Sequence, residues 1–249
     1  MVTKSLESAS QRDDSSFDSS AFARHAMAAW PNMAAIIDHT LLKPEATREQ
    51  VLTLCAEAAK YRFACAMVNP VWASVAYHAL AGTGIPVGVV VGFPLGASLA
   101  GTKRQEAAAL VGKGVREVDM VIGVGLLKSG MNSQVQQDIH GVVEVAHEAG
   151  AIVKVILETC LLTMEEKIRG SELAIAAGAD FLKTSTGFST GGATAADIAV
   201  MRGVAGKRCE VKASGGIRTL DDARILLEAG ASRLGASAGI QIVREMGAE

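Results

Sequence analysis

The chain has 249 residues, of which 49% are hydrophobic and 20% are charged, a composition typical of a globular protein with a large core. Lys plus Arg number 24 and Asp plus Glu 26, so the net charge of −2 argues against nucleic acid and other polyions as partners. No apolar run approaches the roughly 18 residues of a membrane span, and no signal-peptide pattern opens the sequence, so we expect a cytoplasmic protein with no membrane partner. The four cysteines lack zinc-like spacing, so we expect reduced thiols and no metal site.

The first 20 residues are polar, rich in Ser and Asp, and without periodicity, which is typical of a disordered tail. Apolar residues between Phe22 and Trp30 then follow helical spacing up to a proline. We therefore expect a short N-terminal helix that closes one end of a single domain, residues 21–249.

From residue 33 onward the chain repeats one unit: a short apolar run, a loop that contains glycine, and a longer helical pattern rich in Ala and Leu. The predicted strands are residues 34–37, 63–68, 86–91, 117–122, 152–157, 181–184, 210–213 and 232–235. Each run is almost continuously hydrophobic, which is typical of parallel strands covered on both faces. Eight strand–helix units predict an α/β fold, a (β/α)8 TIM barrel, with a doubly wound open sheet as the alternative. The open sheet is disfavoured because no G-x-G-x-x-G motif follows the first strand.

Helix ends are marked independently of the strands. Three segments have the form of a capping box, residues 47–50, 102–105 and 163–166, and Thr194 and Thr219 begin looser versions. Four glycines follow helical patterns directly before strands, where a left-handed residue ends a helix: Gly114, Gly150, Gly178 and Gly230.

Four successive predicted strands, the fourth to the seventh, each carry one ionisable side chain: Asp119, Lys154, Lys183 and Lys212. A buried charge is costly unless it is paired or functional, and a single structural ion pair would leave two lysines unpaired. Neighbouring cations and burial lower the pKa of a lysine, which makes its amine a nucleophile near neutral pH. The pattern therefore predicts Schiff-base chemistry, with Asp119 as the group that moves protons.

The loops after the last three predicted strands are rich in small residues, at positions 184–187, 214–216 and 235–237. Backbone N–H groups in such loops can approach a phosphate, and TIM barrels often bind phosphate after strands seven and eight. We therefore expect a phosphorylated substrate. Arg218 and Lys103 are candidates for further phosphate contacts, although charges that flank helices are usually solvated.

Six segments carry a more specific signal: IDHTLLKP (37–44), VGFPLG (91–96), EVDMVI (117–122), KVILET (154–159), FLKTSTGFSTGGAT (181–194) and VKASGGIRT (211–219). With these segments the sequence resembles the 2-deoxyribose-5-phosphate aldolases, the metal-free class I family, over almost the whole chain after residue 36. The resemblance implies that Lys183 forms the Schiff base, that Lys212 lowers its pKa and that Asp119 transfers protons. It implies supporting roles for Lys154 and Asp38. The residues implied to hold the phosphate and neighbouring hydroxyls are Thr186, Gly187, Gly215, Gly216, Gly235 and Ser237.

The implied reaction is the reversible cleavage of 2-deoxy-D-ribose 5-phosphate to acetaldehyde and D-glyceraldehyde 3-phosphate, without metal or cofactor. The resemblance also implies a homodimer or a larger homo-oligomer. Met67 stands where many members of the family have cysteine, so we expect resistance to trapping by reactive aldehydes, with Cys65 as the exception to test. Some members end in a tyrosine that reaches the site, whereas the tyrosines here are Tyr61 and Tyr77, so we expect proton transfer through Asp119 and water.

Two other interpretations stay open on the sequence. One is a different lysine-dependent phosphosugar aldolase or transaldolase on the same barrel, because fold alone does not fix the reaction. The other is a catalytically silent barrel that binds a phosphosugar. The three residues Asp119, Lys183 and Lys212 argue against a silent protein, because binding alone needs no lysine of lowered pKa.

Overall fold

The structure is a computed structural model that describes residues 30–247. The predicted polar tail and the predicted helix that follows it, apart from its last residue, lie outside the described residues. The described chain begins with a 3₁₀ helix, η1 (Trp30–Ile36), which leads directly into the first strand.

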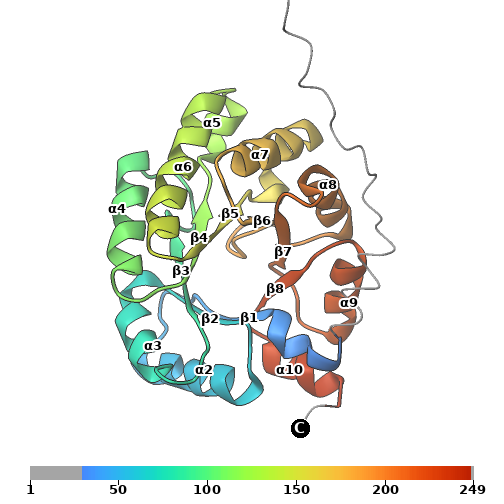
Figure 1. Cartoon of the computed structure of the whole chain (residues 1–249). Helices are drawn as coiled ribbons and strands as arrows, with labels where there is room; N and C mark the ends of the chain where they lie inside the picture. Colours follow the sequence, from blue (N-terminus) through green and yellow to red (C-terminus); the bar gives the residue numbers. More distant parts are fainter. Residues whose placement is uncertain (1–29, 248–249) are drawn as a thin grey trace, which may run out of the picture.

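Eight parallel strands close into a barrel in chain order (Figure 1). They are β1 (Ile37–Leu41), β2 (Cys65–Val68), β3 (Val87–Val91), β4 (Glu117–Val121), β5 (Ile152–Ile156), β6 (Phe181–Lys183), β7 (Glu210–Ser214) and β8 (Arg233–Ala236). The barrel closes because β8 pairs with β1 as well as with β7. The predicted (β/α)8 barrel is confirmed, and the open sheet is wrong.

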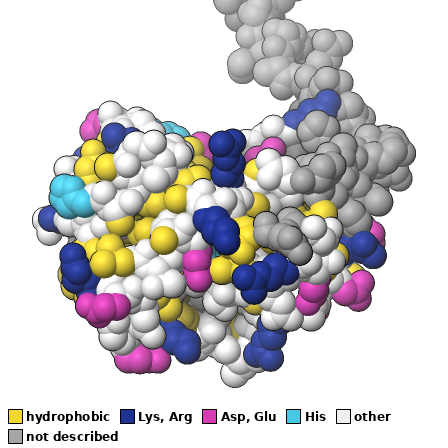
Figure 2. All heavy atoms as spheres, turned by 90° about the horizontal axis from the view of Figure 1, so that it is seen from below, with side chains coloured by type: hydrophobic (Ala, Val, Ile, Leu, Met, Phe, Trp, Pro, Cys, Tyr) yellow, Lys and Arg dark blue, Asp and Glu magenta, His cyan; other side chains and the backbone are white. Residues whose placement is uncertain are grey.

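Helices surround the barrel and cover the outer faces of the strands (Figure 1). They are α2 (Arg48–Tyr61), α3 (Ala73–Ala79), α4 (Ala100–Val111), α5 (Val124–Lys128), α6 (Asn132–Glu148), α7 (Met164–Ala176), α8 (Ala195–Ala205), α9 (Leu220–Glu228) and α10 (Gly239–Glu245), with short 3₁₀ turns η2 (Pro70–Trp72) and η3 (Thr159–Leu161). In the described part of the chain, every helix is too short or too polar to cross a lipid bilayer. On the face in Figure 2, basic, acidic and apolar side chains are interspersed, in keeping with the near-neutral net charge.

The main core lies between the strands and the helices. Successive side chains of a strand point to opposite faces, so every second residue packs outward against a helix. Val89, Val118, Val153, Leu182 and Val211 follow this rule and are fully buried in one apolar cluster. The side chains between them point into the barrel, which leaves the interior free for polar groups.

The first predicted strand was misplaced. Residues 34–36 belong to η1, and β1 covers Ile37–Leu41, whose sequence IDHTL is too polar to be recognised as a buried strand. The polar residues are tolerated because Asp38 points into the charged interior of the barrel and His39 hydrogen-bonds Glu57 at 2.8 Å. The other seven strands differ from their predicted bounds by at most two residues at either end.

Most predicted helix ends are confirmed. Thr47, Thr163 and Thr219 each cap a helix in a reciprocal capping box, and Thr194 accepts from Asp197 N–H. The four predicted stop glycines have positive φ angles between 70° and 117°. The predicted cap at Thr102 is wrong, because α4 begins at Ala100 with its first turn bonded to the carbonyl of Leu99.

Candidate active site

The interior of the barrel is made of layers, each supplied by alternate strands. Side-chain alternation and the strand register give three successive layers toward the carboxyl ends of the strands. The lower layer holds Cys65, Glu117, Phe181 and Arg233; the middle layer Asp38, Gly88, Lys154 and Lys212; and the upper layer Met67, Asp119, Lys183 and Gly235. Charged side chains therefore occupy all three layers, in a region that most barrels fill with branched apolar residues.

Asp119 lies at the centre of the predicted catalytic residues. One carboxylate oxygen lies 2.7 Å from Lys183 Nζ and 2.7 Å from Lys212 Nζ, and the other lies 2.8 Å from Lys154 Nζ. Lys212 also donates to Asp38, which in turn lies 3.4 Å from Lys154. The structure thus brings together all five residues predicted from the strands and the resemblance, each at most 3% exposed.

Lys183 has the lowered pKa that a Schiff-base nucleophile needs. Burial disfavours its charged form and, although the adjacent Asp119 opposes this effect, the nearby Lys212 and Lys154 reinforce it and lower the pKa of Lys183 to about 8. At pH 7 about a tenth of such a lysine is neutral, against about one part in three thousand for a lysine of ordinary pKa.

The two aspartates of the cluster, Asp119 and Asp38, stay ionised. Burial opposes the charge of Asp119, but Lys154, Lys183 and Lys212 outweigh burial and hold the pKa of this carboxyl well below its usual range. Burial also opposes the charge of Asp38, and Lys154 and Lys212 again lower its pKa below the usual value. Conversely, burial disfavours charge on Lys154, but three carboxylates raise its pKa well above that of a free lysine. Lys154 is therefore a permanent cation, distinct from Lys183.

A cavity of about 300 Å³ opens above the lysines at the carboxyl ends of the strands. Lys183 and Lys212 form part of its floor, while Lys43 and Arg218 stand at its wall. The predicted phosphate-binding residues all line it: Thr186, Gly187, Gly215, Gly216, Gly235 and Ser237. A larger, more open hollow beside α10 shares Ser237 but contains none of the barrel lysines, so the smaller cavity is the candidate active site.

Two glycines of the cavity lining show what the absence of a side chain provides at their positions. Gly216 has φ of 83°, and a Cβ atom there would meet nothing within 4 Å, so the space beside it is open to a ligand. A Cβ on Gly235 would lie 3.0 Å from Lys212 Cε. Gly235 therefore makes room for the Lys212 side chain, whatever it does for a phosphate.

Lys103 is not a phosphate contact. Its side chain is fully buried between α4, α6 and β4, where Nζ donates to the Val121 carbonyl at 2.9 Å and to Asp138 at 2.5 Å. In the sequence, Lys103 lies at a predicted helix start, where charges are usually solvated, and no local pattern indicates its buried partner on α6.

Glu158 is a buried residue behind the cavity-lining Thr186 and was not predicted from the sequence. It follows β5 with a left-handed backbone (φ of 57°), and its carboxylate accepts the Thr186 hydroxyl and, at 3.4 Å, the Thr186 N–H. Thr186 Oγ1 in turn accepts the N–H of Phe188 at 3.0 Å. The donors of Thr186 are thus already bonded to a carboxylate. The sequence feature that indicates such a residue is an ionisable side chain directly after the predicted strand 152–157, within the KVILET segment.

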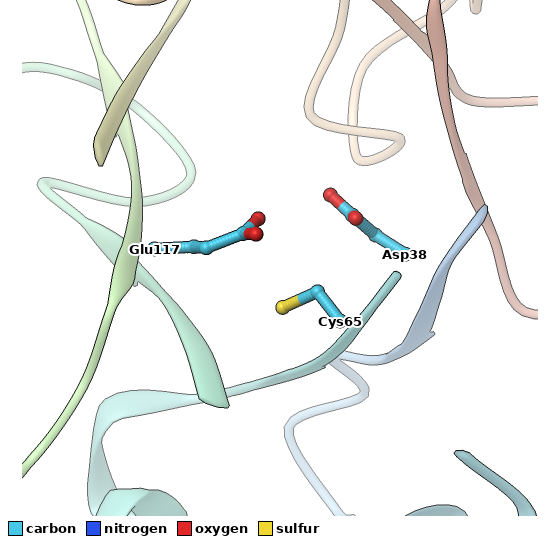
Figure 3. A group of neighbouring side chains, drawn as sticks. All are labelled: Asp38, Cys65 and Glu117. Atoms are coloured by element: carbon cyan, nitrogen blue, oxygen red, sulfur yellow. The ribbon is translucent and has the colours of Figure 1, made fainter. Parts of the chain in front are cut away.

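Two more charged residues of the interior, Glu117 and Arg233, were also missed. Figure 3 shows Glu117, Asp38 and Cys65 pointing toward one another, with one donor atom of each within 4.8 Å of the others. Such a group resembles a metal site, but Lys154 lies 2.6 Å from Glu117, and Arg233 lies 2.8 Å from Asp38. The carboxylates therefore already bind protein cations. Burial, together with these carboxylates, raises the pKa of the Cys65 thiol well above its ordinary value.

The chain is similar in sequence and in structure to deoxyribose-phosphate aldolases. The family model described as DeoC/LacD family aldolase matches residues 32–245. A deoxyribose-phosphate aldolase of Bacillus mycoides (strain KBAB4) is 56% identical over 212 residues, which cover 85% of this chain and 95% of that protein. One from Bacillus cereus (strain AH820) is 55% identical over the same shares of the two chains. The tetrameric deoxyribose phosphate aldolase from Aeropyrum pernix matches with a TM-score of 0.84 and 32% identity, covering 91% of this chain and 97% of that one.

Proposed function

The chain belongs to the DeoC/LacD family of aldolases, and from this premise we propose that it is a deoxyribose-phosphate aldolase. It cleaves 2-deoxy-D-ribose 5-phosphate reversibly to acetaldehyde and D-glyceraldehyde 3-phosphate through a Schiff base on Lys183. The observation that carries the residue assignment is the buried Lys183 amine, with its pKa lowered to about 8, at the floor of a cavity rimmed by glycine loops.

In the direction of synthesis, the neutral amine of Lys183 attacks the carbonyl carbon of acetaldehyde and forms a carbinolamine. Loss of water, after proton transfer to the hydroxyl, gives a protonated imine. This cation is the electron sink that a metal would otherwise provide, so the reaction requires neither metal nor cofactor. Removal of a proton from the methyl carbon then gives an enamine.

The enamine carbon attacks the aldehyde carbon of D-glyceraldehyde 3-phosphate, and the aldehyde oxygen takes up a proton. Water adds to the resulting imine and releases the product with a free Lys183. Asp119 supports these steps because it holds both Lys183 and Lys212 at 2.7 Å, within reach for proton transfer directly or through water. Lys212 keeps the pKa of Lys183 low, and Lys154 and Asp38 hold the carboxylate and the second lysine in place.

The phosphate group binds at the loops after β6, β7 and β8. Gly187, Gly215, Gly216 and Ser237 line this side of the cavity, and Arg218 adds a positive charge at its wall. Thr186 lines the same cavity, but its N–H and hydroxyl already donate to Glu158 and are not free donors for the phosphate. The protein acts in the cytoplasm as a homo-oligomer, and light scattering of the purified protein tests its oligomeric state.

Borohydride trapping with acetaldehyde tests the proposal most directly, because reduction fixes an imine on the lysine that formed it. We expect a two-carbon adduct on Lys183, absent in K183M and unchanged in K128M, a surface lysine paired with Glu166. An adduct on Lys212 would reverse the roles of the two lysines. No adduct from folded protein that still binds the phosphosugar would refute the aldolase assignment, and adduct formation with dihydroxyacetone phosphate but not acetaldehyde would indicate another aldolase.

A further inference from the structure

The lower layer of the barrel carries a pair of charges that the proposed reaction does not use. Arg233 Nη1 donates to Asp38 at 2.8 Å and lies 3.5 Å from Glu117. The other Glu117 oxygen lies 2.6 Å from Lys154. Glu117 therefore contacts Lys154, the partner of Asp119, from the layer below. Arg233 contacts Asp38, the partner of Lys212, in the same way.

The interior charges do not balance when every group is ionised. The three layers carry three carboxylates, Asp38, Glu117 and Asp119, and four cations, Lys154, Lys183, Lys212 and Arg233. One positive charge is thus in excess. Burial and the neighbouring lysines lower the pKa of Lys183 to about 8, so loss of the Lys183 proton relieves the excess.

We propose that Glu117 and Arg233 are positioning residues of the reaction with opposite effects: Arg233 adds positive charge below Lys183 and favours its neutral, nucleophilic amine, and Glu117 offsets that charge. The proposal deepens the proposed function and rests on it. Neither residue reaches the cavity above Lys183, so both act through the groups that they hold. Glu117 acts through Lys154, and Arg233 acts through Asp38.

Other charged groups also face Lys183, from the strands around it and from the cavity above it. Asp119, Lys154 and Lys212 reach it from β4, β5 and β7, while Lys43 and Arg218 stand above it at the cavity wall. The third titratable residue of the lower layer is Cys65, and its raised pKa keeps it neutral.

The position of the pair argues against a purely structural role. Burying charge is expensive, so Glu117 and Arg233 are accounted for by the buried charges above them that need partners, Lys154 and Asp38, which belong to the network around Lys183. Phe181 of this layer lies 5.5 Å from the Arg233 guanidinium and supplies apolar contact on one side. A charged pair retained under a lysine of lowered pKa is therefore explained by the chemistry above it.

The test is the pH dependence of imine formation, measured by borohydride trapping of acetaldehyde on Lys183 in E117Q, R233M and the double variant. E117Q removes a negative charge and should lower the midpoint, whereas R233M removes a positive charge and should raise it, each by about half to one pH unit. At pH 7 this makes trapping about threefold to fivefold faster in E117Q and about threefold to tenfold slower in R233M. The double variant keeps the net charge and should return close to the wild-type midpoint.

The matched control is C65S, which changes a neutral side chain of the same layer and should leave the midpoint in place. E117Q has the same shape as the native residue, so it tests the proposal even if R233M does not fold. Midpoints that do not move, or that move in the same direction in both single variants, would overturn the charge-balance proposal while wild-type trapping at Lys183 still supported the aldolase. Failure of wild-type trapping would instead count against the proposed function itself.

Discussion

Replacement of Lys212 by methionine should move the pH dependence of Lys183 by about two units. The two lysines lie opposite each other on β6 and β7, and both ammonium groups contact the same Asp119 oxygen at 2.7 Å. Their nitrogens are therefore no more than about 5.4 Å apart, where two like charges in a protein environment repel by about 3 kcal/mol. That energy corresponds to about two pKa units.

K212M also leaves Asp119 and Asp38 with less positive charge to bind, which pulls the pKa of Lys183 in the same direction. The midpoint for imine formation with acetaldehyde should rise from about 8 toward 10. The sign follows because only the neutral amine attacks: below its pKa Lys183 is protonated, so raising that pKa removes nucleophile at neutral pH. Trapping at pH 7 should fall about a hundredfold and recover above pH 10.

The assay is single-turnover trapping with borohydride over a range of pH, with peptide mapping to confirm the modified lysine. K128M serves as the control, because it removes a surface lysine paired with Glu166 and should keep the wild-type midpoint. A midpoint that stays near pH 8 in K212M would show that burial alone lowers the pKa of Lys183, and the electrostatic reasoning would be refuted. A uniform loss of rate with an unchanged midpoint would assign Lys212 to proton transfer instead.

Three further outcomes follow from the same geometry. D119N should reduce kcat at least a hundredfold while the protein stays folded by circular dichroism, because the carboxylate that contacts both lysines is lost; an unchanged rate would remove Asp119 from the mechanism. G235A should lower kcat about tenfold, because its Cβ would lie 3.0 Å from Lys212 Cε, and a wild-type rate would mean that the lysine adapts without loss. In native protein, iodoacetamide should modify the exposed Cys160 and spare Cys65, whose raised pKa leaves little thiolate; rapid labelling or an acetaldehyde adduct at Cys65 would contradict its burial.

The sequence predicts the barrel well because one physical pattern repeats. Parallel strands covered on both faces must be apolar on the outside, and each of seven predicted runs meets that condition despite a charged interior. The first strand fails the same test. Asp38, His39 and Thr40 occupy three successive positions of β1, so neither face reads as a hydrophobic stripe. Its place is fixed instead by pairing with β2 and β8, which is a tertiary property.

The catalytic residues could be predicted for a related reason. Asp119, Lys154 and Lys212 stand near the middle of apolar runs, and Lys183 follows Phe181 and Leu182, so an ionisable side chain there lies within a predicted buried strand. Lys103 shows the limit of the argument. It sits in a polar stretch at the start of α4, where a charge normally reaches water, yet it is buried against Asp138, 35 residues away. No local pattern reports a partner at that distance.

The lower layer was hidden because its charges stand at strand starts. Glu117 and Arg233 are the first residues of β4 and β8, and at such positions a charged residue usually belongs to a solvated loop. Side-chain alternation gives the information that was needed: Glu117 is two residues before Asp119 and therefore points into the barrel with it. The same step from Lys183 leads to Phe181, whose ring lies beside Arg233.

This alternation ties the fold to the chemistry. A barrel strand that directs a catalytic side chain inward must also direct the residue two positions earlier inward. Side chains of the lower layer therefore lie next to the charged groups above them. An apolar lower layer would surround Lys154 and Asp38 with groups that cannot solvate them, whereas Glu117 and Arg233 bind them at 2.6 Å and 2.8 Å. The depth of the charged network thus follows from placing a lysine of lowered pKa beside a carboxylate that must remain ionised.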